Sequence, residues 1–134
     1  AMVTARCETN CEIKGFTGAL VDLNISPRDD FSSVMKKLSG LRFGRTDCAQ
    51  PMIDALNKNI MVDKFVIYTD NETWCGNIHP YQALENYRKK VNPNAKLIVC
   101  AMTPTQFSIA NPSDAGMLDI AGFNTSTPNV ISNF

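Results

Sequence analysis

The chain has 134 residues, a length that corresponds to about one domain. Apolar residues make up 44% and charged residues 19%, a balance that is typical of a folded globule and argues against disorder. Basic and acidic residues number 13 each, so the zero net charge removes the main electrostatic argument for direct binding to nucleic acid or to an anionic membrane.

The N-terminal third predicts a helix end, two strands and a second helix. The first nine residues read as the end of a helix, and the chain begins with Ala1, so we expect a fragment of a longer protein. Glu12–Phe16 and Ala19–Ile25 read as strands, the second with the alternation of a half-buried edge. Asp29 and Asp30 begin a helix that Gly40 ends. Its predicted apolar stripe is Phe31, Val34, Met35 and Leu38.

The remaining two-thirds alternates helices with apolar strands. A helix follows the 43–47 loop, with Asp47-x-x-Gln50 or Thr46 as its cap. Lys64–Thr69 and Ala95–Met102 read as strands buried on both faces, and His79-Pro80 opens the helix between them. We expect a short hairpin arm at 107–110, a weaker strand at 117–121 and a final helix from Thr127-Pro128. This order predicts one α/β domain over residues 1–134, with a mostly parallel sheet that helices cover on both faces.

Polar residues follow the first buried strand directly. Thr69-Asp70-Asn71-Glu72 would emerge at the carboxyl edge of the sheet, where open parallel sheets bind ligands. The alternative is that Asp70 and Asn71 only stabilise a turn. A second polar cluster, which includes Thr46, leads into a helix. Together, Thr46 and Asp70 predict part of a hard-cation site, because Mg²⁺ prefers oxygen ligands and keeps several waters.

Several longer motifs resemble one known family. They are YTDNETW at 68–74, His79-Pro80, YRKK at 87–90, AKLIVCAM at 95–102 and GMLDIAGF at 116–123. These look like the C-terminal von Willebrand factor A domain of the Ro ribonucleoprotein autoantigen, in the TROVE family. The resemblance is strong from Thr46 to Phe134 and weaker, but in register, before Thr46. It implies a three-layer Rossmann-like fold, in agreement with the predicted elements.

The resemblance also implies function. The family pairs this domain with a helical-repeat ring that binds small non-coding Y RNAs and the ends of misfolded RNAs, in the cytoplasm and also in the nucleus. Its metal-ion-dependent adhesion site uses Asp-x-Ser-x-Ser after the first strand, a loop threonine and a later aspartate. The threonine carries over onto Thr46 and the aspartate onto Asp70. The Asp-x-Ser-x-Ser element and the first strand have no counterpart in this sequence, so any Mg²⁺ site belongs to the complete domain.

The remaining chemical groups suggest no catalyst. The five cysteines have no Cys-x-x-Cys spacing, which favours a reducing, intracellular compartment over disulfides or zinc. His79 reads as a cap or a surface residue, Trp74 as packing over the strand end, and the six methionines as core filler. We therefore expect a non-catalytic binding module that presents a cation to an unidentified protein partner. The alternative is a magnesium-dependent phosphoryl-transfer or hydrolytic enzyme on the same sheet.

Overall fold

The computed structural model describes residues 1–16, 19–41, 44, 46–70, 75–103 and 109–134. Five helices and five strands follow one another in these parts of the chain. They are α1 (Met2–Cys7), β1 (Lys14–Phe16), β2 (Leu20–Asp22), α2 (Phe31–Ser39), α3 (Gln50–Asn57), β3 (Lys64–Thr69), α4 (Pro80–Lys90), β4 (Lys96–Ala101), β5 (Met117–Ala121) and α5 (Thr127–Asn133). The order confirms the predicted alternation of strands and helices. Among the described residues, no helix has the length and apolar character needed to cross a membrane.

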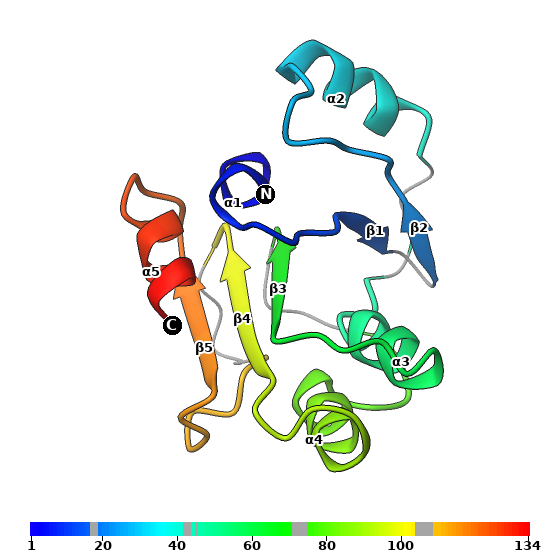
Figure 1. The fold of residues 1–134 in the computed structure, drawn as a ribbon, viewed down its shortest axis with the longest axis vertical. Coiled ribbons are helices and arrows are strands. Elements are labelled where there is room, and N and C mark those ends of the chain that lie inside the picture. The colour runs from blue at the N-terminus through cyan, green and yellow to red at the C-terminus, as the bar shows by residue number, and fades with distance from the viewer. Residues whose placement is uncertain (17–18, 42–43, 45, 71–74, 104–108) are drawn as a thin grey trace.

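The main sheet consists of β3, β4 and β5, in that order and all parallel. Lys64 pairs with Lys96 at the start of β3 and β4, and Leu97 pairs with Met117 where β5 joins. β1 and β2 form a separate antiparallel pair. Figure 1 shows this pair beyond β3, on the side away from β5. The parallel strands place all three carboxyl ends at one edge of the sheet.

Helices α3 and α4 cover one face of the main sheet. Phe65 and Ile67 of β3 alternate with Val66 and Tyr68, so the first pair enters the core beneath these helices. The Tyr87 ring of α4 is fully buried and meets Phe65 edge-on, with ring centroids 5.0 Å apart. Its hydroxyl donates to the Ile60 carbonyl at 2.8 Å, which satisfies the one polar atom of this ring.

The opposite face carries α5 and the short helix α1. Ile131 of α5 is fully buried against Ile98 and Cys100 of β4. Lys64 ties the same helix to β3, because its ammonium donates to the Ile131 carbonyl at 2.6 Å. The two helices also pack on each other. The three-layer α/β arrangement predicted from the sequence is therefore present.

Side-chain caps confirm the predicted starts of α2 and α4. The Asp30 carboxylate accepts the Ser33 N–H at 2.7 Å and begins α2, and Gly40 is its C-cap. At the start of α4, the His79 side chain accepts the Tyr81 N–H, and the Gln82 side chain accepts the His79 N–H at 3.2 Å. His79 is thus a capping residue, as predicted.

Some predicted burial is wrong, and the errors gather in the N-terminal third. β1 and β2 are shorter than predicted. Val21, which was predicted to lie on the apolar face of a half-buried strand, is 39% exposed. Phe31 and Met35 of the predicted α2 stripe are 72% and 49% exposed, whereas Val34 is buried. The reason is that none of the described helices and strands packs extensively on α2, which lies away from the main sheet (Figure 1). Polar contacts hold this part of the chain instead: Arg6 donates to the carbonyls of Pro27 and Asp29, and Lys37 of α2 pairs with Asp29.

Two other predictions need correction. Met52 and Met117 are core residues, but Met35, Met61 and Met102 are exposed, so the methionines are not uniformly core filler. Ile109 and Ala110 of the predicted hairpin arm form a bend rather than a strand. Both are buried in the core that also contains Phe65 and Tyr87. Phe107 and Ser108 of that arm lie outside the described residues.

Candidate functional site at the carboxyl edge of the sheet

Asp70 lies directly after β3, at the carboxyl edge of the main sheet. It is exposed, and the Thr69 hydroxyl donates to its Oδ1 at 3.4 Å. The Asp70 carbonyl accepts the backbone N–H of Thr103 at 3.3 Å and the Thr103 hydroxyl at 3.1 Å. These bonds hold the end of β3 against the chain that leaves β4. The strand therefore delivers a carboxylate to the edge where parallel sheets bind ligands.

Thr46 lies in the loop before α3 and contacts the segment that follows Asp70. The Cys75 N–H donates to the Thr46 carbonyl at 2.9 Å. One residue further along each segment, Gly76 packs against the Asp47 carboxylate. That carboxylate also accepts the Ala49 N–H at 3.0 Å and the Gln50 amide at 2.8 Å. The predicted cap at Asp47 or Thr46 is wrong, because the N-cap of α3 is Ala49, which makes no side-chain capping bond.

The Cys48 thiol reports the electrostatics of this edge. Burial raises its pKa to about 12, and the negative charges of Asp47 and Asp70 act in the same direction. A buried thiol with so high a pKa is unreactive, so Cys48 is a packing residue here.

The Asp70 carboxylate and the Thr46 hydroxyl, which the sequence predicts as metal ligands, are of the oxygen type that Mg²⁺ prefers. Mg²⁺ commonly uses one or two protein carboxylates and completes its shell with water. Within the described ranges, however, no group of three or more His, Cys, Asp or Glu side chains is placed to hold a metal. Thr46 and Asp70 would therefore supply only part of a complete site. Asn71–Trp74, which the sequence also singled out, lie outside the described residues.

The tertiary structure adds a polar group that sequence reasoning missed. Asp119 is half-buried in β5, and its Oδ1 accepts the Ala110 N–H at 3.2 Å. Its charge acts on His79, where it raises the pKa, but burial of the imidazole is the larger effect and the net pKa is lowered. The sequence signal that could have revealed Asp119 is its position as an acidic residue inside the otherwise apolar strand β5.

The fold described above, a parallel sheet between two helical layers with a polar carboxyl edge, defines a von Willebrand factor A-type domain. The family model for the Ro60 vWA domain matches residues 1–134, and this chain therefore belongs to that family.

Relatives and a solved structure agree with this assignment. The chain is 44% identical over 134 residues to an RNA-binding protein RO60 of Deinococcus radiodurans and 40% identical over 135 residues to one of Caenorhabditis elegans. Both matches cover 100% of this chain, which spans 25% and 21% of these relatives. The crystal structure of the Deinococcus radiodurans RO (RSR) protein matches with a TM-score of 0.86 and 44% identity, over 98% of this chain and 26% of that one.

Proposed function

We propose that this chain is a non-catalytic binding module of an RNA-binding ribonucleoprotein. The observation that carries the proposal is the match over the whole chain to relatives that are named RNA-binding proteins. We further propose that a helical-repeat part of the parent protein, outside this chain, holds the small non-coding RNA. The zero net charge supports this division, because a domain that neutralised many phosphates would carry an excess of lysine and arginine.

The proposed role of this domain is to present a divalent cation to a partner ligand. Thr46 would contribute a hydroxyl and Asp70 a carboxylate, and an Asp-x-Ser-x-Ser element on a first strand outside this chain would contribute the other oxygens. A bound Mg²⁺ would accept a carboxylate or phosphate oxygen from the partner. The hydrogen bonds that fix the end of β3 and the Thr46 backbone support the proposal, since a weakly coordinated ion needs ligands that are already positioned.

The test uses the full-length parent protein and its Asp70→Asn variant. We expect Mn²⁺, used as a Mg²⁺ substitute and followed by electron paramagnetic resonance, to bind the wild type at least ten-fold more tightly than the variant. Asp22→Asn is the matched control, because Asp22 is an exposed carboxylate on β2. RNA binding should be unchanged in both variants. Equal Mn²⁺ binding in all three proteins would refute the cation site.

The same proteins test whether the domain is an enzyme. A non-catalytic module has no turnover to lose, so neither a phosphate monoester nor a nucleoside triphosphate should be hydrolysed at a rate that depends on Asp70. Hydrolysis that requires Mg²⁺ and disappears in Asp70→Asn would overturn the proposal. It would instead favour a phosphoryl-transfer or hydrolytic enzyme.

A further inference from the structure

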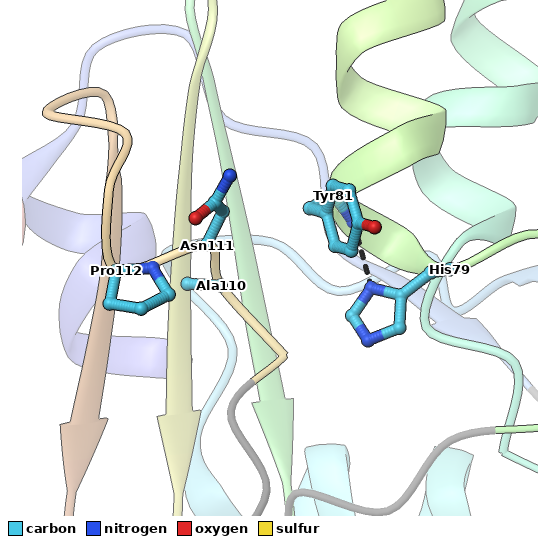
Figure 2. Close-up of a pocket in the computed structure, with 5 residues that line it drawn as sticks. All are labelled: His79, Tyr81, Ala110, Asn111 and Pro112. Atoms are coloured by element: carbon cyan, nitrogen blue, oxygen red, sulfur yellow. Dashed lines mark hydrogen bonds between the residues drawn. The ribbon is translucent and has the colours of Figure 1, made fainter.

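A pocket of about 250 Å³ opens between the start of α4 and the segment that leads into β5. Its lining residues are His79, Tyr81, Ala110, Asn111 and Pro112. Figure 2 shows His79 and Tyr81 on one side of the pocket and the other three on the opposite side. Sites for drug-sized ligands start at about 300 Å³, so this pocket suits a single ring-sized group.

The walls of the pocket favour a flat group. The rings of His79 and Tyr81 are tilted by 47° to each other, with centroids 4.5 Å apart, and they give one wall two aromatic faces. The pyrrolidine ring of Pro112 lies on the opposite side (Figure 2). The Tyr81 ring also packs against the main core, which holds it in place. A planar ring that entered the pocket would therefore find an aromatic face that is already positioned for stacking.

The polar groups offer hydrogen-bond donors. The Asn111 Oδ1 accepts the Ser113 N–H at 3.0 Å, so the carbonyl end of this amide is committed to the backbone. In Figure 2 the amide nitrogen points away from Pro112. The pocket thus combines an aromatic wall with an amide donor on the opposite side. Ligands with a carbonyl or ring-nitrogen acceptor on the edge of a planar ring match this combination.

Electrostatics disfavour an anionic ligand. Among the described residues that line the pocket, there is no lysine or arginine. The His79–Gln82 capping box already uses helix-start N–H groups that could have bound a phosphate. The Asp119 carboxylate lies close enough to act on His79 and would repel an anion. These features select a neutral planar group rather than a phosphate.

We propose that this pocket binds one unpaired base of single-stranded RNA, with the Tyr81 ring as the stacking surface and the Asn111 amide as a hydrogen-bond donor. Single-stranded RNA is commonly recognised in this way, by stacking on aromatic side chains and hydrogen bonding at base edges. The inference rests on the proposed RNA-binding function of the parent protein. Because the pocket takes a base and not a phosphate, its contribution to binding should depend little on salt.

The test is photo-crosslinking of the full-length protein to single-stranded RNA. Two RNA probes are used, one with 5-iodouridine and one with 8-azidoadenosine, so that pyrimidines and purines are both sampled. After irradiation and digestion, mass spectrometry locates the crosslinked peptides, and filter binding measures total RNA affinity in parallel. We expect a crosslink at Tyr81 or at 109–112 with at least one probe, and it should persist when the salt concentration is raised.

Variants separate a base contact from a folding defect. Tyr81→Ala and Asn111→Ala should each reduce the pocket crosslink at least five-fold, because the first removes the stacking surface and the second removes the hydrogen-bond donor. Tyr81→Phe retains the ring and should retain the crosslink, and thermal unfolding confirms that each variant folds. RNA binding with crosslinks only outside the pocket would overturn this inference and leave the proposed function standing. Absence of RNA binding by the full-length protein would overturn both.

Discussion

Gly76 lies so close to Asp47 that a Cβ at Gly76 would be 2.8 Å from all three atoms of the Asp47 carboxyl group. Its φ of +134° is a conformation that residues with a side chain rarely adopt. Together with the bond from Cys75 N–H to the Thr46 carbonyl, this contact joins the loop before α3 to the segment after β3. The candidate cation site depends on that junction, because its two proposed ligands lie on the two joined segments.

Replacing this glycine should therefore weaken the junction. We expect Gly76→Ala to lower the free energy of unfolding by about 1–3 kcal/mol, the usual cost of one strained backbone conformation. Urea unfolding followed by circular dichroism measures the change. Gly40→Ala is the matched control, since a Cβ there meets no heavy atom within 4 Å and Gly40 has a φ of −86°. Equal unfolding midpoints for the two variants would contradict the prediction.

Arg88 is predicted to hold the chain that enters β5. Its guanidinium donates to the Asp114 carboxylate, to the Ala95 carbonyl at 2.7 Å and to the Gly116 carbonyl at 3.3 Å. Arg88→Lys keeps the charge but cannot reach all three acceptors, so we expect a loss of about 1–3 kcal/mol in urea unfolding. Lys89→Arg, one position along on the exposed face, should change stability little. A loss of the same size in both variants would refute a specific role for the guanidinium.

The lowered pKa of Asp114, the partner of Arg88, predicts that stability depends on pH. Burial raises the Asp114 pKa, but the hydrogen bonds from Arg88 and from the Gly116 N–H outweigh it, and the net pKa lies below 3.8. A lowered carboxyl pKa contributes stability that is complete above 3.8 and is lost as the pH falls through the folded-state value. The free energy of unfolding should therefore be measured at pH 7 and pH 3 for the wild type and for Asp114→Asn. We expect the difference between the two proteins to be smaller at pH 3. A constant difference would disprove the link.

His79 should also lower the stability of the protein at acid pH, by a different mechanism. Burial lowers the pKa of its imidazole below 6.5, and Asp119 offsets this only in part. The unfolded chain then binds more protons near pH 6 than the folded chain, so stability falls as the pH drops below 6.5. His79→Asn preserves a capping side chain without this titration. Its unfolding free energy should decline less between pH 7 and pH 5, and parallel declines would argue against the assignment.

The cysteines are predicted to differ sharply in reactivity. Cys48 and Cys100 are fully buried, and burial raises their pKa values to about 12 and about 11. Cys7 is exposed at the end of α1. Brief iodoacetamide treatment at pH 8, followed by peptide mass spectrometry, should modify Cys7 and leave both buried thiols unmodified until denaturant is added. Rapid alkylation of Cys48 in the native protein would show that the loop before α3 opens readily.

Sequence patterns located the elements of the main sheet well. Lys64–Thr69 was predicted residue for residue, and the capping roles of Asp30 and His79 were predicted correctly. These features are local: a continuous apolar run indicates a strand, and a cap needs one side chain at one position. The predicted burial on both faces is confirmed for β4 but is wrong for β3, where only every second residue is buried. The exposure of Phe31 and Val21 could not be predicted in the same way. An apolar stripe indicates a helix or strand face that can be buried, but it does not indicate whether another element covers it.

The amino-acid order alone predicts the α/β class, the order of the elements and the placement of Thr46 and Asp70 at chain segments that border strand and helix ends. Those properties follow from periodicity and capping, which act over a few residues. The three-dimensional packing is needed to show that the Thr46 backbone contacts the segment after Asp70, and that His79 and Asn111 line one pocket. Such contacts join residues far apart in the chain, and they depend on how the strands align in the sheet and how the helices pack on it.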